Sequence, residues 1–139
     1  MKKHLTILLG MLLTALTGAA TAADTTVRIL HLQDNPKFLE LWKQIGAEFE
    51  KQNPGVKIDW QYLENEAFKA KLPTTLQSKE RPDLFYSWAG GVFYDQARAG
   101  VLKDITKSME GEWAATLSPA GVKAFTYERK VYGGSSKTW

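Results

Sequence analysis

Trp88, in the stretch SWAGG, has the surroundings of a binding residue. It is followed by Ala89, Gly90 and Gly91, which carry almost no side chain. Such small residues let a bulky group approach the backbone closely and leave its amides accessible. An indole beside them offers a flat surface for stacking, which suits a sugar ring or another flat apolar face. Two plainer interpretations stay open: Trp88 covers the core at a strand end, and the glycines only form a tight turn.

Other kinds of chemistry find little support in the residue types. The sequence has no cysteine, and His31 is the one histidine downstream of the first 22 residues. No carboxylates are grouped at the spacing of metal ligands, and nothing places two acids across a cleft as a glycosidase requires. The glycines lack the Lys-Ser/Thr of a phosphate loop. We therefore expect no catalytic residue, metal or cofactor, and interpret His31 as a strand residue with satisfied hydrogen bonds.

Three segments rich in β-branched and apolar residues are expected to form strands. The second of them alternates apolar and polar residues, which predicts a half-buried strand near a sheet edge. The third has a continuous apolar core, which predicts a strand that is covered on both faces. The three segments are Thr26–Leu32, Val56–Tyr62 and Asp83–Trp88.

The segments between these strands have helical character. The first helix is expected to begin at Pro36, with Asp34 or Asn35 as its N-cap, and to end at the Asn-Pro-Gly of residues 53–55. The second helix contains Pro73, which predicts a kink or a break. A short third helix, from about Phe93 to Ala99, should end at Gly100. The expected buried residues are Phe38, Leu41, Trp42, Ile45 and Phe49 of the first helix and Phe68, Leu72 and Leu76 of the second.

This alternation predicts an α/β fold, in which a mostly parallel sheet has helices on both faces. Ligands of such sheets bind outside the carboxyl ends of the strands, where three loops of this chain should lie. Asp34 and Asn35 are explained equally well as helix caps, and Glu64 as a solvated helix start. The candidate binding residues in these loops are Gln33, Asp34, Asn35, Glu64, Trp88 and Gly90.

The N-terminus has the pattern of a secretory signal peptide. Lys2 and Lys3 precede an apolar run over residues 5–16, and Ala20-Thr21-Ala22 forms a small-residue cleavage site. The run is shorter than the roughly 20 residues of a spanning helix, so a retained anchor is disfavoured. We predict cleavage after Ala22, export to the periplasm and, since no cysteine lies nearby, no lipid anchor. Cleavage lowers the net charge from +3 to +1, so no basic patch indicates nucleic acid binding.

Four stretches of the sequence resemble the extracellular solute-binding proteins of family 1. They occur in the order FEKQNPGVKIDWQY, FKAKLPTTLQS, RPDLFYSWAGG and DQARAGVLKDIT. Members of this family are periplasmic receptors of ATP-driven sugar importers, and maltose-binding proteins belong to it. The resemblance implies a monomeric two-lobed receptor, closing on a sugar by a hinge and docking on an ABC permease. It further implies that Gln33, Asp34, Asn35 and Glu64 bond sugar hydroxyls and that Trp88 stacks on a ring.

The end of the sequence departs from the family pattern. Arg129 of RKVYGG stands where the family has a turn glycine, and GSSKTW follows in place of a crossover strand. Family members run to several hundred residues, so we expect residues 23–139 to form an incomplete N-terminal part of the first lobe. Such a part would not be competent for transport alone. The alternatives are a small secreted carbohydrate-active enzyme and a non-functional truncated remnant.

Overall fold

A three-stranded parallel sheet lies at the centre of the N-terminal half, in the strand order β2-β1-β3. The computed structural model describes residues 25–135; the predicted signal peptide therefore lies outside the described residues. Strand β1 (Thr25–His31) pairs along its whole length with β2 (Val56–Tyr62). Its other edge pairs with β3 (Leu84–Phe85). The predicted parallel α/β arrangement is confirmed, and β2 is the edge strand that its alternating pattern indicated.

The third strand is much shorter than the sequence predicted. Only Leu84 and Phe85 pair with β1, and the prediction that this strand is covered on both faces is wrong. Leu84 is 56% exposed and Tyr86 is 48% exposed, so the apolar run Asp83–Trp88 leaves the sheet almost at once. A carboxylate fixes its start: Asp83 accepts a hydrogen bond from the backbone N–H of Arg28, 2.9 Å away.

Helix α1 (Pro36–Gln52) covers one face of the sheet and begins and ends where the sequence predicted. The side chain of Asn35 accepts a hydrogen bond from the N–H of Lys37, 3.0 Å away, and Pro36 fits the first turn because its missing N–H has no partner to lose. At the other end the Asn53 side chain donates to the carbonyl of Phe49. The local signals at both ends therefore determined the helix bounds.

Only part of the predicted apolar face of α1 contacts the sheet. Trp42 stacks on Trp60 of β2 at 5.5 Å between ring centroids, and Gly46 lies so close that a Cβ there would be 3.2 Å from the Trp60 indole nitrogen. One row of the helix is turned away from these contacts and is 45–56% exposed, which corrects the prediction that it is buried. The exposed row consists of Leu41, Ile45 and Phe49.

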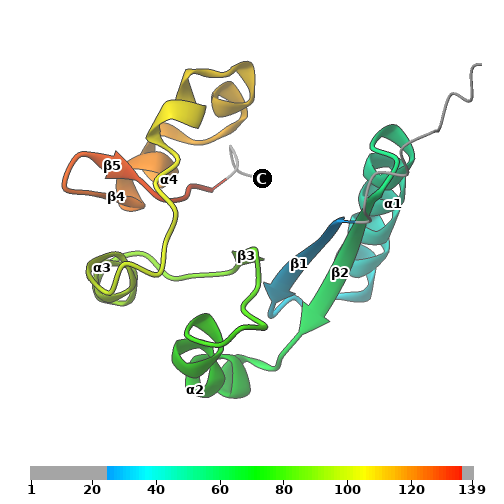
Figure 1. Cartoon of the computed structure of the whole chain (residues 1–139), viewed down its shortest axis with the longest axis horizontal. Coiled ribbons are helices and arrows are strands. Elements are labelled where there is room, and N and C mark those ends of the chain that lie inside the picture. Colours follow the sequence, from blue (N-terminus) through cyan, green and yellow to red (C-terminus); the bar gives the residue numbers. More distant parts are fainter. Residues whose placement is uncertain (1–24, 136–139) are drawn as a thin grey trace, which may run out of the picture.

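Helix α2 (Asn65–Leu76) lies near the ends of β1 and β2, on the side away from α1, as Figure 1 shows. Its residues Phe68, Leu72 and Leu76 are buried and form the core with Leu30 of β1, as the sequence predicted. The helix continues through Pro73 without a break.

The C-terminal half begins with α3 (Gly91–Arg98), which starts slightly earlier than predicted. Gly100 has a φ of 69° just beyond its end, as expected of a helix C-terminus. Phe93 is buried and packs against Phe125 and Tyr132, whose rings lie 5.3 and 6.2 Å away. The remaining elements are η1 (Thr106–Glu110), η2 (Glu112–Thr116), α4 (Pro119–Ala124), β4 (Thr126–Tyr127) and β5 (Lys130–Val131).

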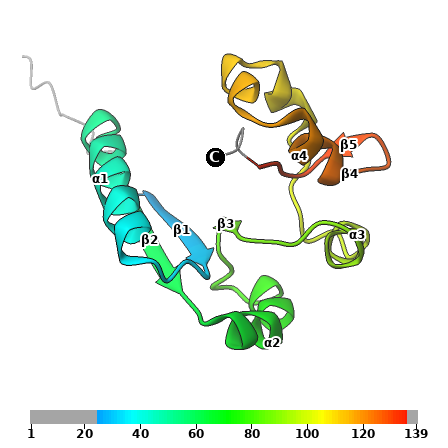
Figure 2. The ribbon, with the colours of Figure 1, turned by 180° about the vertical axis from the view of Figure 1, so that it is seen from behind.

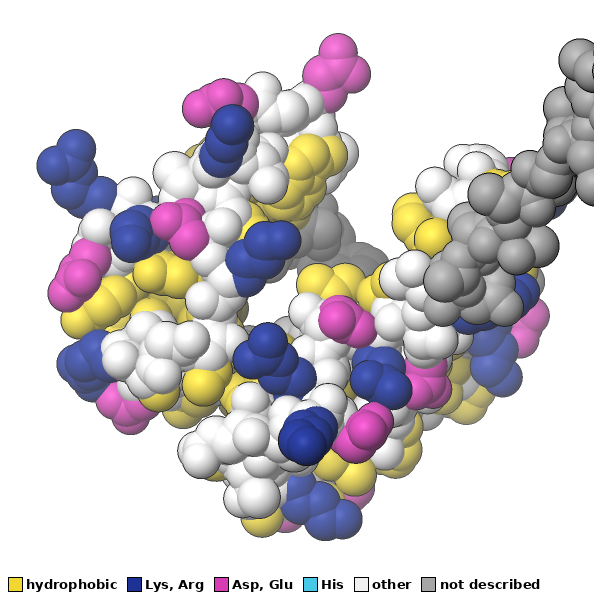
Figure 3. Space-filling view, in the orientation of Figure 1, with side chains coloured by type: hydrophobic (Ala, Val, Ile, Leu, Met, Phe, Trp, Pro, Cys, Tyr) yellow, Lys and Arg dark blue, Asp and Glu magenta, His cyan; other side chains and the backbone are white. Residues whose placement is uncertain are grey.

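The elements form two groups connected through β3 and α3. Figures 1 and 2 show α1, β1 and β2 on one side and α4 with the β4–β5 hairpin on the other. The space-filling view in Figure 3 shows an open hollow between the groups, with hydrophobic side chains exposed on both sides of it. Within residues 25–135, no helix is long and apolar enough to cross a membrane.

Candidate functional site

The carboxyl ends of the three strands meet at one edge of the sheet. His31 lies opposite Tyr62 in the β1–β2 ladder, and Leu30 lies opposite Phe85 in the β1–β3 ladder. The segments that follow these strands then pack on the same hydrophobic core through Leu32, Leu63 and Trp88. The three loops predicted to carry the site therefore begin side by side.

Trp88, in the third loop, packs against two aromatic rings. Its ring meets that of Phe68 edge-to-face at 5.7 Å and that of Tyr86 at 5.4 Å. Phe68 is fully buried, so Trp88 is anchored to the core while the residue as a whole is only half-buried. Trp88 thus does cover the core at a strand end. The same anchoring also gives the exposed part of the indole a fixed orientation.

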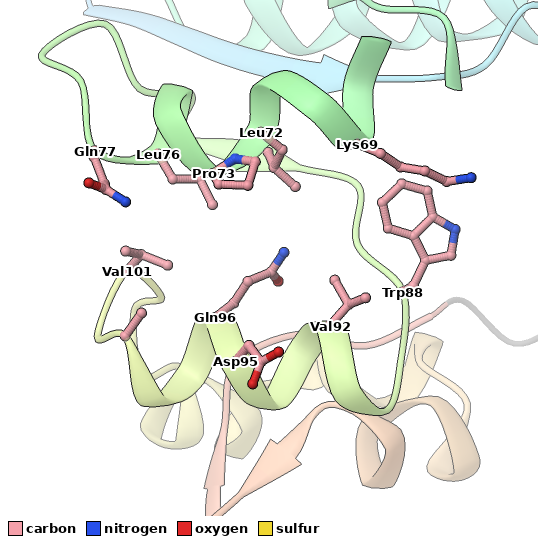
Figure 4. A pocket seen from close by; sticks show the side chains of 11 residues that line it. Lys69, Leu72, Pro73, Leu76, Gln77, Trp88, Val92, Asp95, Gln96 and Val101 are labelled. Carbon is pink, nitrogen blue, oxygen red and sulfur yellow. The ribbon is translucent and has the colours of Figure 1, made fainter. Parts of the chain in front are cut away.

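Two pockets share Trp88 as a lining residue. The α2–α3 pocket, of about 750 Å³, lies between those two helices and is lined mainly by apolar side chains such as Leu72 and Val92 (Figure 4). The loop pocket, of about 410 Å³, lies between the segment after β3 and the end of the described chain, where Tyr86 and Tyr132 line it. A ligand that occupies the Trp88 end of either pocket would contact the indole.

The polar candidates of the first two loops are not lining residues of either pocket. Among the described residues that line the pockets, none is Gln33, Asp34, Asn35 or Glu64. Their side chains have structural partners: Gln33 accepts from the N–H of Asn35, and Glu64 caps α2 by accepting from the N–H groups of Glu66 and Ala67. Asp34 is exposed. The cap function that the sequence left open is thus confirmed for Asn35, and Glu64, expected to be a solvated helix start, is the N-cap of α2.

Gly90 has a φ of 81° and a ψ of −138° at the start of α3, a conformation that side chains rarely adopt. A Cβ on Gly90 would meet no atom within 4 Å, so the surroundings leave open space here. The turn therefore requires glycine for its backbone conformation, and the adjacent space leaves room for a ligand.

His31 is 6% exposed at the end of β1 and contacts the Trp42 ring at 5.1 Å. Burial lowers the pKa of its imidazole, although a hydrogen bond with the Gln33 backbone acts in the opposite direction. Its Nδ1 atom has no hydrogen-bond partner among residues 25–135, so the expectation of fully satisfied hydrogen bonds is wrong. In the described part of the chain, no three His, Cys, Asp or Glu side chains are grouped as a metal site would need.

Sequence reasoning missed two residues that surround Trp88. The Lys69 ammonium lies 5.9 Å from the centroid of the Trp88 ring, and Tyr86 meets that ring edge-to-face. The sequence predicts a buried strand for the segment that contains Tyr86. Lys69 had no local signal, because its proximity to Trp88 arises only when α2 and the segment after β3 pack together.

Comparison with known proteins decides the family. Residues 35–139 match the family described as bacterial extracellular solute-binding protein. The chain belongs to this family. This solute-binding protein is also 25% identical, over 96% of its length, to a protein described as an uncharacterized lipoprotein in the oleD 5′ region of Streptomyces antibioticus.

Solved structures agree with this assignment. A protein from a study of xylan utilization by Caldanaerobius polysaccharolyticus superposes with a TM-score of 0.70 at 29% identity, over 78% of this chain. An ABC substrate-binding protein from Listeria monocytogenes, in complex with cycloalternan, gives 0.65 at 30% identity over 79%. A solute-binding protein from Thermotoga lettingae, bound with α-D-tagatose, gives 0.67 at 25% identity over 78%.

This solute-binding protein corresponds to only a fraction of these relatives. It spans 28% of each of the three structures and 30% of the Streptomyces protein. The chain has a parallel sheet packed with helices and superposes on these solute-binding proteins over 78% of its length, so the predicted solute-binding lobe is confirmed as the fold class.

Proposed function

We propose that this chain is the N-terminal part of the first lobe of a sugar-binding receptor that serves an ABC importer. The observation that carries the proposal is the position of Trp88, anchored on Phe68 at the edge where three parallel strands end. Ligands of open α/β sheets bind outside this edge. The sugars bound to the Listeria and Thermotoga structures support a carbohydrate as the ligand class.

In this proposal Trp88 stacks on one face of a sugar ring, and the neighbouring loops supply polar contacts. Asn35 uses its side-chain oxygen for the cap of α1, which leaves its amide N–H groups for sugar hydroxyls. Glu64 uses Oε2 for the cap of α2, which leaves Oε1 as an acceptor. Gln33 and Asp34, in the same loop as Asn35, supply further polar contacts to the sugar. The open space beside Gly90 accommodates the ligand.

We further propose that residues 1–22 are a signal peptide cleaved after Ala22 and that residues 23–139 act in the periplasm as a monomer. Closure of a hinged receptor requires two lobes. Since this chain spans only 28% of the length of these relatives, we infer that transport and docking on the permease belong to a receptor of their full length. Binding of the sugar without chemical change is the activity expected here, and no nucleic acid partner is expected.

The test measures sugar binding by the chain after signal removal. A panel of neutral trisaccharides would be titrated by calorimetry against the wild type and the Trp88→Ala and Trp88→Leu variants. Loss of the stacking contact should weaken binding roughly tenfold in both variants. Leucine keeps an apolar side chain against Phe68, and a circular dichroism spectrum of each variant shows whether a loss of binding comes from unfolding.

Trp113→Ala is the matched control. Trp113 is an exposed tryptophan of η2 that lines neither pocket, so its replacement should leave sugar affinity unchanged. The proposal is contradicted if no sugar binds, or if Trp88→Leu binds like the wild type. Chromatography of the incubated sugars tests the enzyme alternative, because a receptor returns them unchanged whereas a hydrolase yields shortened products.

A further inference from the structure

Lys69 and Trp88 form a cationic corner at the sheet edge where the sugar is proposed to bind. The Lys69 Nζ atom lies 5.9 Å from the centroid of the indole ring. Lys69 belongs to the second turn of α2, which begins just after the carboxyl end of β2. Figure 4 shows Lys69 and Trp88 together at one end of the α2–α3 pocket, with Gln77 and Val101 at the other.

The Lys69 ammonium is held in place only weakly. It donates to Glu66 Oε1 at 2.9 Å, and the two side chains are 48% and 74% exposed. Ion pairs between such exposed side chains contribute little to stability. An ammonium group has three N–H donors, and Glu66 uses one of them, so two remain for a ligand beside the indole.

The other charges of this pocket do not neutralise the corner. The pocket is also lined by Asp95, but that carboxylate pairs with Arg98 on the same helix. The next pocket-lining residue after Lys69 on α2 is Leu72, and the first on α3 is Val92; both are apolar. A negative charge entering beside Trp88 would therefore meet a half-exposed ammonium next to an apolar pocket wall, and its attraction to that ammonium would depend on the salt concentration.

We propose that Lys69 is a specificity-determining residue that selects sugars carrying a carboxylate, as in uronic acids. The inference rests on the proposed function, because it requires a sugar ring to stack on Trp88. The ammonium lies over the indole ring, 5.9 Å from its centroid, so a sugar that stacks on this ring would come within reach of Nζ. A carboxylate on this sugar would receive a charge-assisted hydrogen bond, which is stronger than the bond to a neutral hydroxyl.

The experiment compares sugars that differ only in this group. Matched trisaccharide pairs of glucose and glucuronic acid, galactose and galacturonic acid, and mannose and mannuronic acid would be titrated at low and high salt. For each pair that binds, the acidic member should bind roughly tenfold more tightly at low salt. The preference should shrink at high salt, because screening weakens the attraction.

Three variants separate Lys69 from general charge effects. Lys69→Gln should abolish the acidic preference while neutral sugars still bind, and Lys69→Arg should keep it, because the positive charge is retained. Lys71→Gln is the matched control: it removes the same charge from an exposed position on the same helix that lines neither pocket, and the preference should persist.

The outcomes distinguish this inference from the proposed function. Equal binding of neutral and acidic members, or a preference that survives in Lys69→Gln, would overturn the role of Lys69 while the sugar-binding function stands. Binding of no member of any pair would overturn both. A preference lost in Lys69→Gln and kept in Lys69→Arg would support the selection of acidic sugars.

Discussion

Replacement of Arg129 by glycine should stabilise the protein, because the β4–β5 hairpin holds a non-glycine residue in a left-handed conformation. The hairpin pairs Tyr127 with Lys130, so Glu128 and Arg129 form a two-residue connection. Their φ angles are 47° and 66°. Two-residue hairpin turns with positive φ at both central positions favour Asn-Gly or Asp-Gly, since glycine adopts this conformation without a steric penalty.

The magnitude follows from two opposing terms. A non-glycine residue in the left-handed region costs roughly 1–2 kcal/mol. Glycine is more flexible in the unfolded chain, which offsets about 0.5–1 kcal/mol of the gain. We therefore expect Arg129→Gly to raise the free energy of unfolding by about 0.5–1 kcal/mol and the Tm by roughly 2–5 °C. Arg129 is the better position to change, because Glu128 hydrogen-bonds Tyr127 and raises the pKa of its hydroxyl.

Urea unfolding followed by tryptophan fluorescence measures this effect, with the midpoint shifted and the m-value unchanged. Arg129→Ala is the control, because alanine removes the same side chain but keeps the left-handed penalty. Its stability should stay close to that of the wild type. The reasoning is refuted if Arg129→Gly is no more stable than the wild type, or if Arg129→Ala gains as much.

Two further predictions concern His31 and Gly90. Burial lowers the pKa of folded His31 below the ordinary value, so the unfolded chain takes up its proton first as the pH falls. The stability that His31 contributes should be constant above its unfolded-state pKa of about 6.5 and decrease as the pH falls below this value. Urea midpoints measured between pH 5 and 8 should show this slope. If the same slope persists in His31→Phe, His31 is not its origin. Gly90→Ala should destabilise the fold by about 1–3 kcal/mol through its backbone conformation alone (φ 81°, ψ −138°), since the new Cβ meets no neighbour. A thermal scan checks it, and Gly91→Ala, without this positive φ, should be tolerated.

The local features of the chain could be predicted where a few adjacent residues determine them. Asn35 and Pro36 define the start of α1, and the positive φ of Gly100 follows the end of α3. The spacing of Phe68, Leu72 and Leu76 identified the buried face of α2 correctly. In each case the signal lies within a few residues, so no knowledge of distant packing was needed.

The errors arose where a distant partner decides the outcome. Helical spacing alone predicted that Leu41 and Ile45 belong to a buried face. Burial also depends on what the helix packs against, and in the described structure only the row with Trp42 and Gly46 contacts the sheet. Lys69 was missed for a similar reason, since nothing in its neighbourhood along the chain points to Trp88. Trp88 itself was found because small residues follow it directly.

The shortness of β3 has a consequence for how the backbone near Trp88 should exchange its amide hydrogens. The backbone N–H groups of Asp83 and Tyr86 tie this segment to β1, donating to the carbonyls of Arg28 and Leu30. Amide exchange follows the free energy of local opening, which is small where few contacts must break. The segment that carries Trp88 should therefore lose its protection in openings that leave the long β1–β2 ladder intact. A sugar bound on the indole would slow exchange here first, and would report occupancy of the site from the backbone alone.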